Sequence, residues 1–194
     1  VDNSVPQPAT VGHYLEKLNS NESQIELQFD SASIFCTASL RENLEEKGFF
    51  RNVYQAHNRL NLSGDYAKIT PLTPEVVKSL CAVYHADAVL ALNRLIYADK
   101  ITEFTYENEF GFHNYLDVKI RTDWSIQYPT DKPMTYTHFT DSFTWQSSNA
   151  IRSKAANELP ARYDALVDAS LLTGLNVADR LIPRWEKEDR YFYN

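Results

Sequence analysis

The sequence contains few of the features from which enzymes commonly build a reaction site. Only five glycines occur among 194 residues, and there is no glycine-rich phosphate loop and no GxSxG, HExxH or CxxC motif. The two cysteines, Cys36 and Cys81, match no metal-binding spacing. We therefore expect no catalytic residues, no cofactor and no metal site.

Runs of basic residues and long apolar runs are also missing from the sequence. The net charge is −7, and no run of basic residues is present, which argues against nucleic acid as a partner. No apolar stretch approaches the roughly 20 residues that a membrane-spanning helix needs. For the cysteines we favour two buried free thiols, while a single disulfide would require an oxidising compartment.

Aromatic residues are abundant, at 13% of the sequence, and they favour sheets and interfaces. The clearest pattern is "YLDVKIRTDWSIQY" at 115–128, which alternates with a period of two and predicts a strand. Its expected core side is Leu116, Val118, Ile120, Thr122, Trp124, Ile126 and Tyr128, and its charged residues are Asp117, Lys119, Arg121 and Asp123.

The charged side of this strand does not suit a catalytic pair of carboxylates. Asp117 and Asp123 would lie about 20 Å apart along one strand, whereas glycosidase carboxylates lie within about 10 Å of each other. Neighbouring charges of opposite sign instead indicate the solvated face or a protected edge of a sheet.

Three main helices are predicted. The first covers about 33–47 and ends at Gly48, with an apolar stripe of Ile34, Phe35, Ala38, Leu40 and Leu44. The second begins at Thr73, which can cap it, with Pro74 in the first turn. The third follows Pro160 and ends before Pro183, and Gly174 within it indicates close packing on the sheet.

Further strands are predicted around these helices. Residues 49–55 are typical of a short strand, and the continuous apolar run at 87–92 indicates a central strand covered on both faces. Residues 108–114 are expected to form a turn or hairpin loop, and 134–145 the return strand, in which a bulge would reconcile two apolar parities. The segment "HYLEKLNSNESQ" at 13–24 could carry a short helix or a loop.

This order predicts one domain over residues 1–194, with 1–30 partly irregular and 184–194 as a tail or short strand. Early alternation of strands and helices favours parallel pairing, and the later run of strands favours an antiparallel meander. The expected fold class is α/β (α+β), a mixed sheet with a long antiparallel meander and three main helices packed on it.

Two histidine–aspartate pairs are candidate sites. His85 and Asp87 provide two ligands, fewer than a metal usually takes, and fit better as a helix end and a strand entry. His138 and Asp141 could form an acid–base pair only if they converge, and exposed strand polarity is the simpler interpretation.

The candidate interaction surface lies at a hairpin tip and in the C-terminal tail. At the tip, aromatic residues flank a histidine; in the tail, "RWEKEDRYFYN" mixes arginine with aromatics, the residue types that anchor interfaces. A tucked tip and a tail that covers the sheet are the simpler alternatives. The candidate residues are Phe110, Phe112, His113, Arg184, Trp185, Arg190, Tyr191 and Tyr193.

Several phrases of the sequence resemble one family. They are "VDNS", "LRENLEEKGFFRNV", "LTPEVVKSLCAVYHADAVLALNRL", "DVKIRTDWSIQYPTDKP", "DSFTW" and "GLNVADRLIPRWEKEDRYFYN". Together they resemble uncharacterised envelope lipoproteins of Bacteroidetes, whose domain is similar to the TolB N-terminal domain and the periplasmic domain of CsgG. The resemblance implies a lipidated cysteine upstream of this chain, and a location in the periplasm or at the outer membrane. It carries over no catalytic residue.

Three functions follow as hypotheses. The first is a non-enzymatic cell-envelope domain, a lipoprotein that binds or helps assemble envelope proteins and is held at the membrane by its lipid. The second is a small-molecule or glycan-binding module using Phe110, Phe112, Trp124 and Trp145, since stacking needs exposed rings. The third is a hydrolase of unknown substrate built around His138 and Asp141.

Overall fold

The computed structural model describes residues 13–16, 23–24, 31–56, 71–105 and 111–182. Within them lie five strands, β1 (His13–Glu16), β2 (Ser23–Gln24), β3 (Val89–Phe104), β4 (Phe112–Gln127) and β5 (Thr135–Asn149). The helices are α1 (Ala32–Glu46), α2 (Pro74–Tyr84), α3 (Arg152–Asn157) and α4 (Arg162–Leu181). None of these helices has the length and apolar character required to cross a membrane.

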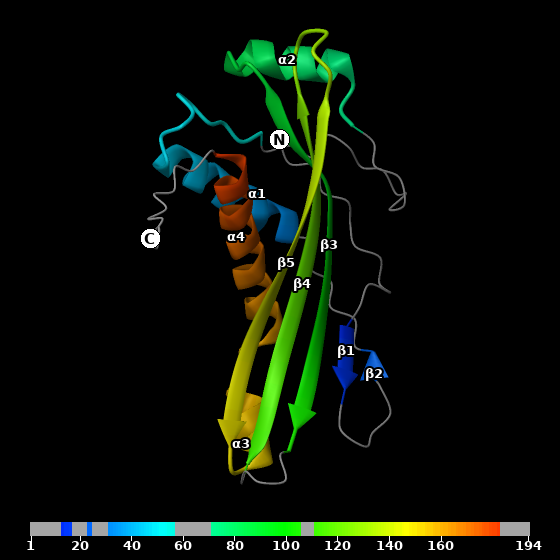
Figure 1. Cartoon of the computed structure of the whole chain (residues 1–194), viewed down its shortest axis with the longest axis vertical. Coiled ribbons are helices and arrows are strands. Elements are labelled where there is room, and N and C mark those ends of the chain that lie inside the picture. Colours follow the sequence, from blue (N-terminus) through cyan, green and yellow to red (C-terminus); the bar gives the residue numbers. More distant parts are fainter. Residues whose placement is uncertain (1–12, 17–22, 25–30, 57–70, 106–110, 183–194) are drawn as a thin grey trace, which may run out of the picture.

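The strands form one sheet in the order β2-β1-β3-β4-β5. Strand β1 runs parallel to β3, and the other neighbours are antiparallel. Strands β3, β4 and β5 are long and make an extended meander along the whole length of the molecule (Figure 1). The mixed sheet and the α+β class expected from the sequence are confirmed.

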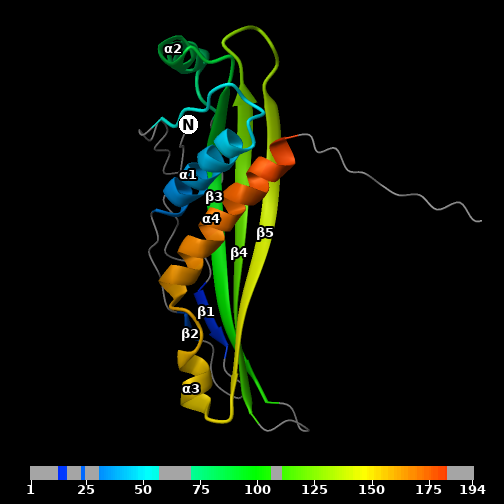
Figure 2. The ribbon, with the colours of Figure 1, turned by 90° about the vertical axis from the view of Figure 1, so that its left-hand side faces the viewer.

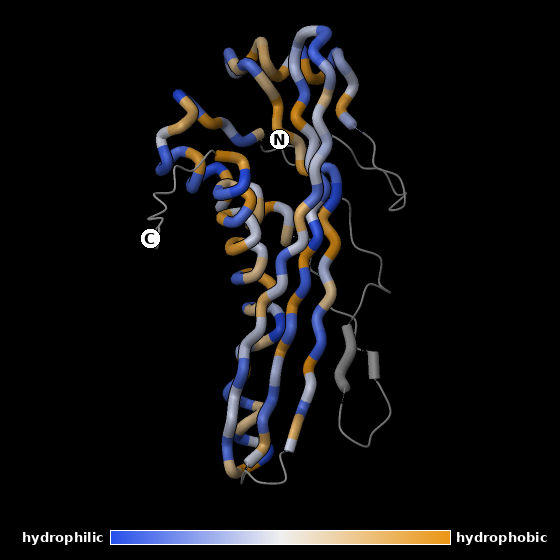
Figure 3. Tube along the Cα trace, viewed as in Figure 1, coloured by the Kyte–Doolittle hydropathy of each residue, from blue (hydrophilic) through white to orange (hydrophobic). Residues whose placement is uncertain are grey.

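Helices α1 and α4 cover one face of this sheet, while α2 lies at one end of the molecule and α3 at the other (Figures 1 and 2). The main core lies between these helices and the sheet, and Leu95, Val118, Ile120, Trp124 and Leu166 are among its fully buried side chains. The core side predicted for 115–128 is confirmed for Val118, Ile120 and Trp124. Figure 3 shows the alternation as interleaved hydrophilic and hydrophobic stretches along the strands.

A second, smaller core explains the continuous apolar run at the start of β3. Val89 and Ala91 point away from the main core and pack with Leu72, Val77 and Cys81 beside α2. Leu92 belongs to the main core, and Leu90 packs against it. The prediction of a strand covered on both faces is therefore confirmed at this end of β3.

The predicted bulge lies in a different strand from the one expected. Strand β5 pairs with β4 without a register shift, whereas the β3–β4 register shifts between Leu92 and Arg94. The extra residue, Asn93, allows both Leu92 and Leu95 to face the main core, because it reverses the parity of the strand between them. Asp141 occupies an inward position of β5 without a bulge, since it has an arginine partner there.

Helix α1 buries part of the predicted stripe, since Leu40 and Leu44 lie in the main core and Phe35 packs against it. Ile34 is exposed, and the side facing the core carries small side chains that include Ser33, Cys36 and Ser39. The small side chains are needed because α4 crosses so closely at Gly174 that a Cβ atom there would collide with the Cys36 carbonyl oxygen. Gly174 thus permits close packing on α1, and not on the sheet as predicted.

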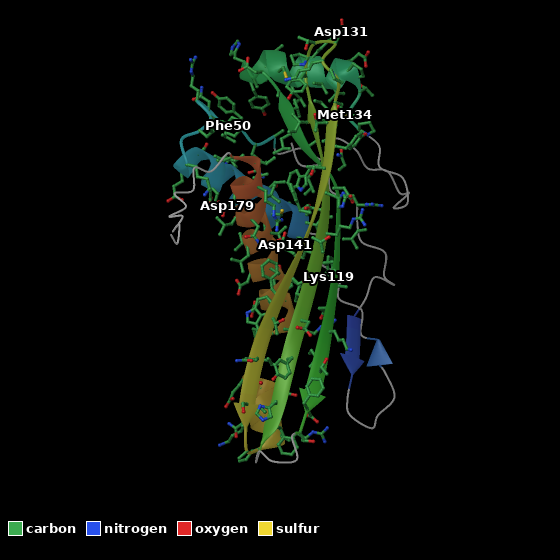
Figure 4. All side chains as sticks on the ribbon, in the orientation of Figure 1. Phe50, Lys119, Asp131, Met134, Asp141 and Asp179 are labelled. Atoms are coloured by element: carbon green, nitrogen blue, oxygen red, sulfur yellow. The ribbon has the colours of Figure 1, made fainter. Side chains whose placement is uncertain are left out.

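Two segments differ from the predicted secondary structure. Residues 49–55 form no strand, and Phe49, Phe50 and Tyr54 are exposed. Figure 4 shows Phe50 in the loop that follows α1. Residues 13–16, for which a helix or loop was expected, form β1, because four residues pair in parallel with His13 opposite Asp99. Pairing with β3, and not the local sequence, determines that this short polar segment is a strand.

Candidate functional site

A polar surface lies on the side of the sheet opposite α1 and α4. We call it the polar face and define it by eight exposed side chains of β4 and β5, namely Asp117, Lys119, Arg121, Tyr136, His138, Thr140, Ser142 and Thr144. Successive side chains of a strand point to opposite faces of the sheet, so the same two strands also supply side chains to the buried core. Asp117, Lys119 and Arg121 therefore lie on the solvated side of the sheet, as the sequence predicted, whereas Asp123 on the same side is buried.

The register of β4 and β5 sets charged residues beside hydroxyl groups. Asp117 lies opposite Thr144, Lys119 opposite Ser142, and Arg121 opposite Thr140. The Thr144 hydroxyl donates to Asp117 Oδ1 at 2.6 Å. The result is a row of charges of mixed sign along β4 and a row of hydroxyl groups along β5, both available for polar contacts.

A buried ion-pair cluster borders the polar face near α2. Asp123 is buried, Arg94 Nε lies 2.7 Å from its Oδ2, and Arg121 Nη2 lies 3.3 Å from its Oδ1. Arg121 thus belongs both to the polar face and to this cluster. Because a different guanidinium meets each carboxylate oxygen, Asp123 fixes the two arginines and is not a free base.

The side-chain amide of Gln127, in β4, connects the sheet to the segment before α2. With its amide oriented toward Leu72, Gln127 donates to the Leu72 carbonyl at 2.9 Å and accepts from the Leu72 N–H at 3.3 Å. Thr73 then caps α2, and its hydroxyl accepts from the Val76 N–H. These contacts fix the entry into α2, as predicted from Thr73 and Pro74, at the border of the polar face.

The geometry does not bring His138 and Asp141 together. His138 is exposed on the polar face opposite Asp123, whereas Asp141 lies opposite Ile120 on the buried face. Figure 4 shows Asp141 beside α4. There it accepts from Arg180 Nη2 at 2.7 Å and from Asn176 Nδ2 at 3.0 Å. Side chains on opposite faces of one strand cannot exchange a proton directly, so this pair is no acid–base dyad.

Ion pairs between the sheet and the helices were missed in the sequence. Besides Asp141, the inward-facing Asp99 lies 2.6 Å from Arg162 Nε at the start of α4, and Glu103 lies 2.7 Å from Arg152 Nη2 on α3. The sequence did contain a signal for a buried Asp141, since this residue lies on the same side of its strand as Phe139 and Phe143. The arginine partners of these carboxylates could not be identified from the sequence, because they lie far away along the chain and only the fold brings them close.

The other histidine–aspartate pair is structural. His85 is the C-cap of α2 with φ of 50°, and its backbone N–H donates to the Cys81 carbonyl. Asp87 is exposed, and the described part of the chain contains no cluster of three or more metal-ligating side chains. Burial, together with the charge of Asp87, raises the pKa of the Cys81 thiol. Cys36 and Cys81 are both buried and free, as favoured from the sequence.

The sequence candidates for an interaction surface are mostly outside the described residues. These are Phe110, Arg184, Trp185, Arg190, Tyr191 and Tyr193. Phe112 and His113 are described, and they lie within β4, half-buried and paired with Asn149 and Ser148. They are therefore strand residues, and the prediction of a loop over 112–114 was wrong because strand pairing extends to Phe112.

The aromatic rings proposed for a glycan site do not form one platform. Trp124 is fully buried in the main core, where no ligand can stack on it. Trp145 and Phe112 are half-buried on the helix-covered side of the sheet, and Trp145 packs 6.5 Å from Phe143 between ring centroids. The described rings therefore serve mainly as core and core margin.

These features define an α+β domain with one helix-covered sheet face and one polar face. The chain belongs to the family described as "Domain of unknown function (DUF8603)", whose model matches residues 1–193. Among solved structures it is similar to one titled "Crystal structure of uncharacterized protein", with 10% identity and a TM-score of 0.36, over 93% of this chain and 91% of that chain. No curated protein matches.

Proposed function

We propose that this chain is a non-enzymatic interaction domain that binds another protein through the polar face. The observation that supports this proposal is the arrangement of the polar face, where exposed charges of both signs lie beside a row of hydroxyl groups on a rigid sheet. Such a surface offers many hydrogen-bonding groups without desolvation of an unpaired buried charge. Protein partners recognise surfaces of this mixed polarity by complementary charge and hydrogen bonding.

The chemistry of the polar face favours binding over catalysis. The carboxylate nearest to His138 in register is Asp123, and both of its oxygens are occupied by arginine side chains. An acid–base reaction needs a histidine or carboxylate that is free to exchange a proton with the substrate and a second group that orients it. The exposed His138 meets the first of these requirements, but no described carboxylate is placed to orient it.

For the location, we propose the cell envelope, with a lipid anchor upstream of this chain and an envelope protein as the partner. The support is the resemblance of the phrases around "LRENLEEKGFFRNV" and "DVKIRTDWSIQYPTDKP" to envelope lipoproteins. Mutation of the upstream cysteine in the full-length protein should then release it from the membrane fraction. A full-length protein that is soluble before this mutation would contradict the anchor.

The interaction is tested by photo-crosslinking in native envelopes. A photoreactive amino acid replaces Lys119 on the polar face, and a matched control replaces Tyr163, which is exposed on α4. We expect one discrete adduct with a different protein from position 119 and none from position 163. Equal adducts from both positions, or none from either, would contradict the proposal.

A further inference from the structure

Strand β5 is the last strand of the sheet. Its 15 residues pair on one side with β4, and no described strand lies on its other side. Half of the backbone N–H and C=O groups of such a strand point outward, away from its neighbour. A long open edge of this kind is a template for pairing with another strand.

Most of the usual protections of an edge strand are missing from β5. The segment "TYTHFTDSFTWQSSN" contains no proline, lysine, arginine or glutamate. Its only carboxylate, Asp141, is turned inward and held by Arg180, and the register with β4 runs without a bulge. Natural sheets place charges, proline or bulges on an edge that must stay unpaired. Strand β5 is therefore suited to pairing.

An apolar strip lies beside this edge on the helix-covered side. Phe139, Phe143 and Trp145 are half-buried along β5. On α4, Leu172 is 41% exposed and precedes Asn176 and Arg180 by one and two turns, and both of these contact Asp141. Residues four apart share a side of a helix, so Leu172 lies on the β5 side of α4. A neighbouring strand would cover part of this strip.

We propose that a second copy of this chain pairs with β5 in antiparallel orientation, which forms one continuous sheet across a two-fold axis. A two-fold contact places the same surface against itself, so each side chain of β5 meets a side chain of β5 in the other copy. The exposed side of β5 consists of Tyr136, His138, Thr140, Ser142, Thr144, Gln146 and Ser148, and none of these is a carboxylate, lysine or arginine. Self-pairing therefore brings no fixed like charges together, and it allows Thr–Thr and Thr–Ser pairs, which are favourable.

This assembly has a consequence for the polar face. In an antiparallel pair the two-fold axis stands perpendicular to the sheet, so the helix layers of both copies share one side. The two polar faces would then lie side by side on the other. A partner with two binding segments would gain affinity by engaging both copies at once.

The assembly is tested by sedimentation velocity over a range of concentrations. The variant T140K/S142K places four lysines, two from each copy, at the proposed interface. Within one copy they lie opposite Arg121 and Lys119 on the solvated side of the sheet, so circular dichroism is used to confirm that the variant folds. S79K/A82K adds the same charge on the exposed side of α2 as a control. We expect a concentration-dependent dimer for the unchanged chain and the control, and dimer formation at least ten-fold weaker for T140K/S142K.

A cysteine scan gives a second measurement that does not depend on charge. Single cysteines at 138, 140, 142, 144 and 146 are oxidised, while the native Cys36 and Cys81 are buried. Disulfide-linked dimers should peak at one position, nearest the axis, and decline on both sides. A monomer at concentrations up to about 1 mM, where even weak interfaces associate, would overturn the proposal, as would dimers that T140K/S142K leaves unchanged. Either result would leave the proposed function untouched, because crosslinking from position 119 tests binding of a different protein.

Discussion

Individual buried carboxylates connect the sheet to its helices. Asp99 and Asp141 are each buried on the helix-covered face, and each accepts from two nitrogens of one arginine of α4. A buried ion pair of good geometry contributes little net stability, but the loss of one partner leaves the other charge uncompensated. These residues therefore fix where α4 lies on the sheet.

Replacement of Asp141 by alanine should destabilise the fold by about 2–3 kcal/mol, because Arg180 and Asn176 lose their acceptor beside the core. Arg180 is partly exposed, which keeps the cost below that of a fully buried pair. Urea denaturation measures the free energy of unfolding. Asp131→Ala, in the exposed loop before β5 (Figure 4), serves as a control and should change it by less than about 0.5 kcal/mol. Equal effects of the two substitutions would refute the role of Asp141.

Gly174→Ala should cost about 1–3 kcal/mol or more, because the added Cβ would lie 2.9 Å from the Leu40 backbone nitrogen as well as against the Cys36 carbonyl. Backbone atoms of α1 cannot move aside without shifting the helix. Thermal unfolding followed by circular dichroism measures the loss. Asp168→Ala, at an exposed position of the same helix, is the comparison and should be nearly neutral. A stabilised Gly174→Ala variant would show that α1 and α4 do not cross as described.

At the scale of the elements, the sequence contained most of what defines the long strands and the helix ends. Alternation identified the core side of β4, and Gly48, Thr73 and Pro74 identified the end of α1 and the start of α2. These signals are local, because a strand shows its two faces and a helix end its caps within a few residues.

Elements that depend on distant partners could not be predicted. The four residues of β1 form a strand only because β3 pairs with them, and the buried side of α1 follows from the close approach of α4. The bulge at Asn93 depends on the register between β3 and β4. For the site, the alternation predicted a solvated charged side on β4, but the adjoining hydroxyl row on β5 requires the register between the two strands.

The start of α2 offers a test at this scale. Thr73→Ala removes the hydroxyl that accepts from the Val76 N–H, and it should destabilise by about 1 kcal/mol. Hydrogen exchange should show faster exchange in the first turn of α2. Ser79→Ala, on the exposed side of the same helix, should leave that turn unchanged. Unaltered exchange in Thr73→Ala would mean that Pro74 and the Gln127 contact with Leu72 suffice to hold this end.

At the scale of the whole molecule, the helices are distributed unevenly over the sheet. Helices α1 and α4 bury one face, α2 covers the other face only near one end, and the polar face extends beyond it (Figure 2). Helix-covered sheets bury their apolar sides, so the side left open must carry polar residues to remain solvated. The same distribution that stabilises the domain leaves the polar face available to a partner.

The central claim is that this face binds a protein, and the affinity of the crosslinked partner for a charge-swapped face tests it most directly. D117K/K119E exchanges two exposed charges of β4 at constant net charge, and R41E/E45R exchanges an exposed ion pair of α1 in the same way. Isothermal titration calorimetry should show affinity at least ten-fold weaker for D117K/K119E and unchanged for R41E/E45R, because only the first swap alters charge complementarity at the interface. Unchanged affinity for D117K/K119E would contradict binding through the polar face.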